Sequence, residues 1–164
     1  MTQPSTSCCK DITGPENATS AILLVYDIFG FWTQTLLGAD ILASTKTSSS
    51  PQGIKVFVPD FFGSGNEADI AYWPADTDEK WEYIFKVFRE QAEKEKSLRK
   101  TLGIINVLKE RDEVKNLKSW GLLDIVGVQS DNGFARRTIF KPGAQTHPSL
   151  VDSEDAKLVT IPQL

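Results

Sequence analysis

The segment at residues 21–30 constrains the fold of this chain more than any other. It reads A-I-L-L-V-Y-D-I-F-G, so five aliphatic residues and Tyr26 precede an acid and a glycine. An uninterrupted apolar run of this length is typical of a strand that is buried on both faces of a parallel sheet. Ligands of open α/β sheets bind at the carboxyl ends of such strands. Asp27 and the turn that ends at Gly30 therefore form a candidate functional site.

The residues that follow predict a strand–helix–strand unit. Residues 33–46 favour a helix, because apolar residues recur at helical spacing with Ala39 and Ala43 as small packing residues. The apolar set comprises Leu36, Leu37, Ile41 and Leu42. Residues 47–53 have the composition of a loop, and 55–59 form a second short apolar run that ends at Asp60. Two parallel strands joined through a helix indicate the α/β class.

Two amphipathic helical segments and further strands are expected beyond this unit. Asp76 or Thr77 can cap the first helix, whose aromatic and aliphatic stripe we interpret as core packing rather than as a cofactor site. The stripe comprises Trp81, Ile84, Phe85 and Phe88. In the second segment, the expected inner residues are Leu98, Leu102, Ile105 and Leu108. Residues 119–128, 140–146 and 158–162 are the remaining predicted strands, and the charges mixed through 80–118 are typical of a solvated helix face.

Composition excludes several classes of function. The 164 residues suit one domain, and a net charge of −4 gives no basic surface for nucleic acid. No segment approaches the roughly 20 apolar residues that span a bilayer, and the polar N-terminus is no signal peptide. The only cysteines, Cys8 and Cys9, are adjacent, so we expect a cytoplasmic protein with reduced thiols. We expect no metal and no cofactor. The glycine pair at 63–65 does not predict a dinucleotide loop, because it lacks the third glycine and the apolar helix of such a loop.

Several blocks together resemble the dienelactone hydrolase family of α/β-hydrolases. They occur in the order of the family and at nearly its spacing, and they cover most of residues 13–164. The blocks are 26–30 (Y-D-I-F-G), 34–40 (Q-T-L with G-A-D), 58–62 (V-P-D-F-F), 147–152 (H-P-S-L-V-D) and 155–162 (D-A-K with V-T-I-P). The agreement of several blocks is more specific than any one of them.

The resemblance implies a partial α/β-hydrolase fold, with a mainly parallel sheet flanked by helices. It also implies hydrolysis of cyclic enol-lactones and related small esters by a Cys-His-Asp triad. Asp27 then stands where the family places an acid near the thiol, and the Ile28 N–H matches the first donor of the oxyanion hole. Phe29 and Trp32 are the residues that we expect to contact a small ester or lactone substrate.

The chain departs from the family where the nucleophile belongs. The family reads approximately W-G-x-x-G-Y-C-W-G-G-K at its nucleophile elbow, whereas residues 120–130 read W-G-L-L-D-I-V-G-V-Q-S and contain no cysteine. The only histidine, His147, matches the H-P motif and not the triad base. The triad aspartate and histidine of the family lie beyond the strand that begins at Val159, and the chain ends at Leu164 before either. We therefore expect no catalytic activity from this polypeptide.

An N-terminal hairpin and the last strands of the family also have no counterpart. We expect a flexible segment at 1–12 and an incomplete hydrolase domain at 13–164. Missing strands leave unpaired sheet edges and uncovered apolar helix faces, so we expect a marginally stable protein that associates with itself non-specifically.

The replaced elbow suggests a hypothesis about the gene. Permitted codons for residues 123–130, read one base earlier, can spell G-Y-C-W-G-A-K, which is the missing elbow. Residues 122 to about 137 are then a frame-shifted or mis-spliced translation, and the family pattern resumes near Phe140. Genuine divergence of a strand and loop is the alternative for this region. At the level of function, the alternatives are a ligand-binding remnant and a flavodoxin-like nucleotide-binding module, which only the strand–helix–strand unit supports.

Overall fold

The computed structural model describes residues 9–124 and 140–145. These residues form a mixed five-stranded sheet of the order β1-β3-β2-β4-β5. The strands are β1 (Cys9–Thr13), β2 (Ser20–Val25), β3 (Lys55–Pro59), β4 (Ser119–Asp124) and β5 (Phe140–Gln145). β1 runs antiparallel to β3 at one edge, and the other neighbouring pairs are parallel.

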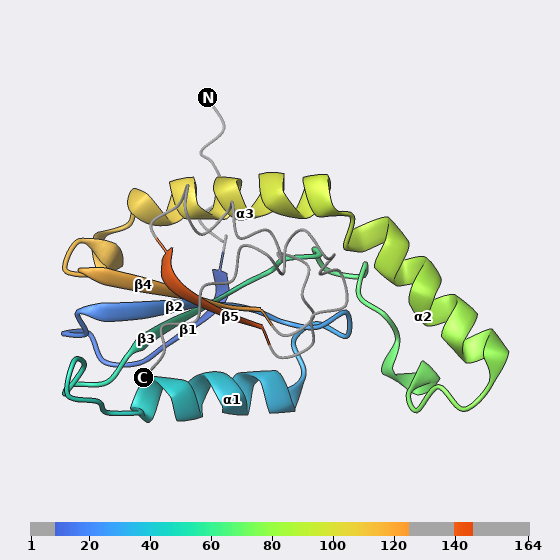
Figure 1. The fold of residues 1–164 in the computed structure, drawn as a ribbon, viewed down its shortest axis with the longest axis horizontal. Coiled ribbons are helices and arrows are strands. Elements are labelled where there is room, and N and C mark those ends of the chain that lie inside the picture. Colours follow the sequence, from blue (N-terminus) through green and yellow to red (C-terminus); the bar gives the residue numbers. More distant parts are fainter. Residues whose placement is uncertain (1–8, 125–139, 146–164) are drawn as a thin grey trace, which may run out of the picture.

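Helices cover both faces of this sheet, as the α/β class requires (Figure 1). They are α1 (Thr33–Ser44), α2 (Asp78–Gln91) and α3 (Lys94–Lys109). Figure 1 shows α1 on one face, α3 on the opposite face, and α2 extending beyond the end of the sheet. Single 3₁₀ turns lie at Ile70–Tyr72 and Asp112–Val114. The α/β class and the mainly parallel sheet that we expected are confirmed.

The two central strands owe their position to uninterrupted apolar sequence. Every residue of β3 is buried. Leu23, Leu24 and Val25 at the end of β2, and Tyr26 directly after it, are each at most 1% exposed. Phe57 of β3 stacks on Trp120 of β4 with 5.3 Å between ring centroids, across the face of β2. The strand predicted from residues 21–25 is therefore confirmed, with burial on both faces.

Helix α1 contacts the sheet through its small residues. Thr35, Ala39 and Ala43 are its buried residues, as expected for the two alanines. The expectation for the leucine and isoleucine set is wrong in part, because Leu37 is 55% and Ile41 is 67% exposed. Small side chains at every fourth position let the helix axis approach the strands closely, and this turns the larger residues outward.

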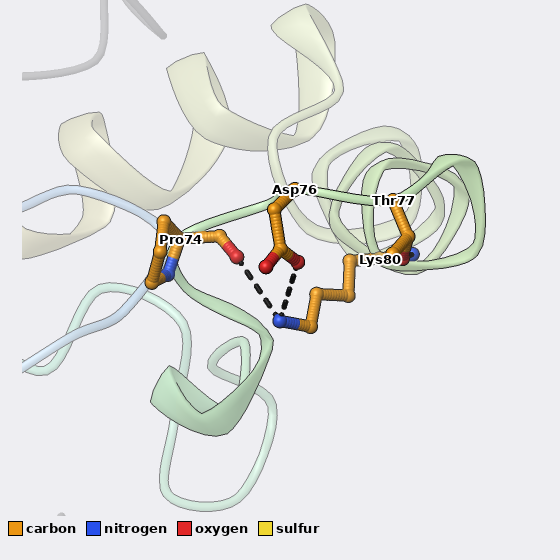
Figure 2. Close-up of polar contacts among 4 residues, drawn as sticks. All are labelled: Pro74, Asp76, Thr77 and Lys80. Carbon is orange, nitrogen blue, oxygen red and sulfur yellow. Dashed lines mark hydrogen bonds and ion pairs between the residues drawn. The ribbon is translucent and has the colours of Figure 1, made fainter.

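Helix α2 begins where the sequence predicted it. Thr77 is the N-cap, and its Oγ1 accepts a hydrogen bond from the Lys80 amide at 3.3 Å. The Lys80 ammonium lies back across the preceding loop, where Nζ is 2.7 Å from Asp76 Oδ1 and 3.2 Å from the Pro74 carbonyl oxygen (Figure 2). This contact lowers the pKa of the Asp76 carboxyl, chiefly through the hydrogen bond from Lys80.

The predicted apolar stripes of α2 and α3 are only partly core. On α2, Ile84 is buried, but Trp81 is 42% and Phe85 is 51% exposed, because α2 extends beyond the sheet. Ile105 and Leu108 of α3 are buried as expected. Leu102 is 42% exposed, however, and Ser97 and Thr101 lie on the buried face of α3 instead.

The N-terminal edge of the sheet corrects a further expectation. β1 begins at Cys9, inside the segment at 1–12 that we expected to be flexible. It pairs with the exposed edge of β3 from Cys9 opposite Pro59 to Thr13 opposite Val56, so it satisfies backbone groups that would otherwise be unpaired. The structure thus supplies one antiparallel edge strand where we expected none.

Within the described residues, no helix is long and apolar enough to cross a bilayer.

Candidate functional site

The strand order places a topological switch point at the carboxyl ends of β2 and β4. From β2 the chain passes through α1 to β3 on one side, and then returns past β2 to β4 on its other side. The strands that follow β2 along the chain therefore lie on both sides of it, and ligands of open α/β sheets bind at such a switch point. The segment that leaves β2 is Asp27–Ile28–Phe29, which the sequence had singled out.

A tight turn with an aspartate at its start shapes this end of β2. Asp27 Oδ1 accepts a hydrogen bond from the Phe29 amide at 2.9 Å, and the Asp27 carbonyl accepts one from the Gly30 amide at 3.1 Å. This arrangement is an Asx turn. Gly30 has φ +81°, and a Cβ at this position would lie 2.6 Å from Glu67 Cγ. The turn therefore requires glycine at its end, because other residues are strained at positive φ.

Ile28 joins the loop after β2 to the loop after β3. Its side chain is 7% exposed, and its carbonyl accepts a hydrogen bond of 2.7 Å from the Ala68 amide in the loop after β3. Within the described part of the chain, no acceptor is found for the Ile28 N–H. The residue thus has a fixed backbone position and an amide donor at the carboxyl end of the central strand.

The two predicted substrate contacts lie in different settings. Phe29 is partly buried and its ring meets Trp73 edge to face at 6.1 Å. The Trp73 ring in turn contacts the Trp81 ring edge to face, with 6.4 Å between ring centroids. A row of aromatic side chains therefore extends from the turn to α2. Trp32 is 40% exposed at the position that precedes α1. The structure thus places Asp27, Ile28 and Phe29 in one turn and Trp32 beyond it, exposed at the start of α1.

Sequence reasoning missed a buried polar cluster beside this turn. The Tyr26 hydroxyl donates to Asp60 Oδ1 at 3.2 Å and accepts from the Phe62 amide at 3.1 Å. Asp60 Oδ1 also accepts from the Gly63 amide at 3.1 Å. Burial above all, together with the Asp60 carboxylate, raises the pKa of the Tyr26 phenol. Because Tyr26 lies in the apolar run, its hydroxyl gave no separate signal, although an acid directly after β3 offered one.

Lys100 was also missed, because it lies among the charges that we interpreted as a solvated helix face. Its Nζ donates to the Phe61 carbonyl at 2.8 Å and lies 5.7 Å and 6.0 Å from the ring centroids of Phe61 and Phe62. An open groove of about 350 Å³ surrounds it, between the loop after β3 and α3. Burial, with a smaller effect from Lys96, lowers the pKa of the Lys100 ammonium.

The other half of the predicted site cannot be placed. β4 pairs with β2 up to Val25 opposite Asp124, and the expected elbow region beyond Asp124 lies outside the described residues. The same holds for Cys8, for His147 with its H-P motif, and for the strand expected at 158–162. Among the described residues, no cluster of histidine, cysteine or acidic side chains could hold a metal ion.

Comparison with known proteins identified no relative of this chain. No protein-family model matches the chain. No curated protein and no solved structure matches it either.

Proposed function

We propose that this chain descends from the dienelactone hydrolases and binds small lactones or esters at the turn after β2, without hydrolysing them. The observation that carries the proposal is the position of the Ile28 amide. One oxyanion donor of an α/β-hydrolase comes from the loop between a central strand and the helix that follows it, and the nucleophile lies on the turn after another central strand. Ile28 lies in the loop between β2 and α1, beside the end of β4.

The segment that continues from β4 lacks the cysteine that the resemblance would place there. Residues 123–130, which begin at the end of β4, contain no cysteine. Cys9 cannot replace it, because it is buried in β1 opposite Pro59. β3 lies between β1 and β2, so Cys9 is separated from the Ile28 turn by two strand spacings, or roughly 10 Å. We therefore expect a carbonyl bound at the Ile28 amide to meet no attacking cysteine.

The test combines a binding measurement with an assay of turnover. We expect a five-membered enol-lactone to shift the amide resonance of Ile28 in a heteronuclear NMR titration of the full chain. We expect Phe29→Ala to weaken this binding, and Leu37→Ala, on the exposed face of α1, to leave it unchanged. Hydrolysis of p-nitrophenyl acetate should not exceed the background rate, before or after alkylation with iodoacetamide.

Two results would count against this proposal. An Ile28 resonance that stays in place at saturating lactone would remove its structural basis. Turnover that iodoacetamide abolishes would contradict the inactive state and would identify Cys8 or Cys9 as a nucleophile.

The hypothesis of a shifted reading frame concerns the same position. Its codon match starts at Leu123, one residue before the end of β4, which is where a nucleophile elbow would leave the sheet. We expect genomic and transcript sequences across residues 122–140 to encode the cysteine elbow in another frame. If no frame encodes it, the region has genuinely diverged and the frame hypothesis is wrong.

A further inference from the structure

The groove around Lys100 has features of a second binding site, between the loop after β3 and α3. We define the Lys100 groove by the residues that line it: Asp60, Phe61, Phe62, Gly63, Lys100, Gly103, Ile104 and Val107. Its volume of about 350 Å³ lies within the range of small-molecule sites. Most of the side chains that line it are aromatic or aliphatic, with Phe61 and Phe62 almost fully buried and Val107 45% exposed.

The charge in this groove is incompletely matched. Lys100 is partly buried and donates to the Phe61 carbonyl at 2.8 Å. An ammonium group has three N–H donors, so two remain after this contact. Within the described part of the chain, no carboxylate lies within ion-pairing distance of Lys100 Nζ. A partly buried cation without a counterion is unfavourable, and an anionic ligand would relieve that cost.

Asp60 does not supply the missing counterion. Its Oδ1 accepts hydrogen bonds from the Tyr26 hydroxyl and the Gly63 amide, so these two donors fix the orientation of the carboxylate. Burial lowers the pKa of Lys100 despite the opposing effect of Asp60, which indicates that the attraction between them is too weak to compensate for desolvation. The groove therefore offers an apolar surface with the Lys100 cation, and with an Asp60 carboxylate that is already hydrogen-bonded to Tyr26 and Gly63.

We propose that the Lys100 groove binds a small amphipathic carboxylate, whose anionic end contacts Lys100 Nζ and whose apolar part lies against Phe61, Phe62, Ile104 and Val107. The ligand class follows from complementarity of charge and polarity, because a single cation beside apolar side chains matches one anion on an apolar body. A highly charged ligand such as a nucleotide would place further anionic groups against apolar residues and Asp60. The proposal does not depend on lactone binding at Ile28.

The experiment compares octanoate with octanamide, which has the same apolar chain without the charge. We expect calorimetric titration of the full chain to show saturable binding, with octanoate about tenfold tighter than octanamide. Lys100→Met should abolish this preference and leave octanamide binding nearly unchanged. Lys96→Met removes the same charge one turn earlier on α3, at a lysine that does not line the groove, and should keep the preference.

A second variant keeps the test decisive if Lys100→Met fails to fold. Val107 is half exposed, so Val107→Glu should fold and should weaken octanoate binding more than octanamide binding through like-charge repulsion. The proposal is overturned if octanoate binding does not saturate, or if both lysine variants reduce the preference equally. It is also overturned if Lys100→Met retains the preference, since Lys100 would then only tie α3 to the loop after β3. None of these outcomes involves the Ile28 resonance, so the two proposals can fail separately.

Discussion

Replacing Tyr26 by phenylalanine tests the buried polar cluster most directly. The side chain is 0% exposed, and its ring packs edge to face on Phe31 at 4.7 Å and on Phe62 at 5.6 Å. Tyr26→Phe keeps these ring contacts and removes only the hydroxyl. The Phe62 amide then loses its acceptor inside the protein, whereas Asp60 Oδ1 still accepts from the Gly63 amide.

The expected loss of stability follows from the group that is left unpaired. A buried donor without an acceptor costs about 1–3 kcal/mol, so we expect the free energy of unfolding to fall by about 2 kcal/mol. With a urea m-value of about 2 kcal/mol per molar, the unfolding midpoint should fall by about 1 M at unchanged m. Urea titration followed by circular dichroism measures both quantities.

Tyr83 provides the matched control. Its hydroxyl accepts a hydrogen bond from the Asp69 amide at 3.1 Å in an exposed setting, where water can replace it. Tyr83→Phe should therefore change the free energy of unfolding by less than about 0.5 kcal/mol. If Tyr26→Phe is equally mild, the Tyr26 hydroxyl does not satisfy a buried amide and this reasoning is refuted.

The stability of wild type and Tyr26→Phe at alkaline pH provides a second test of the Tyr26 hydroxyl. The folded protein raises the pKa of Tyr26 above the value of about 10 of an unfolded chain. The proton is therefore held more tightly in the folded state, and the stability that this provides is complete below pH ~10 and is lost as the pH rises toward the folded pKa. Above pH ~10, the free energy of unfolding should fall more steeply for the wild-type protein than for Tyr26→Phe. The difference in this free energy between the two proteins should therefore become smaller as the pH rises.

Two further substitutions test the backbone turn and a surface ion pair. Gly30→Ala should destabilise the protein by about 1–2 kcal/mol, because residue 30 has a positive φ and a Cβ there would be crowded by Glu67. Gly38→Ala, in open space on α1, should instead stabilise it by about 0.5–1 kcal/mol. Thermal unfolding measures both changes in stability, and changes of the same sign would contradict the prediction. The hydrogen bonds from Arg111, at 2.7 and 3.2 Å, lower the pKa of Glu113 to about 2. Both side chains are partly exposed, so Glu113→Gln should cost less than about 1 kcal/mol at neutral pH, and this cost should fade from pH ~4.3 down to about 2, as urea titrations would show.

Short-range pattern was sufficient to predict most elements of the fold. The apolar runs at 21–25 and 55–59 correspond to β2 and β3, and Thr77 caps α2 as predicted. These features depend on local chemistry, namely continuous apolar sequence and a hydroxyl at a helix N-terminus. The boundary at Cys9 was missed because the pairing of β1 depends on the open edge of β3, which lies more than 40 residues away.

The facing of the helices could not be derived from spacing alone. Leu37, Ile41 and Leu102 have helical periodicity, yet they face solvent while Ala39, Ser97 and Thr101 lie against the core. Periodicity identifies residues that share a face, but the closest approach of helix to sheet decides which face is buried. Small residues permit that approach, so here they prevail over larger apolar ones.

For the candidate site, the sequence by itself determined the central strand and the turn after it, because Asp27 and Gly30 encode that turn through an Asx hydrogen bond and a positive φ. Only the tertiary structure decided what surrounds it. The strand order brought the ends of β2 and β4 together, joined Tyr26 to Asp60, and enclosed Lys100 against Phe61 from 39 residues away. Such contacts arise from packing between distant segments, and no local pattern of residues records them.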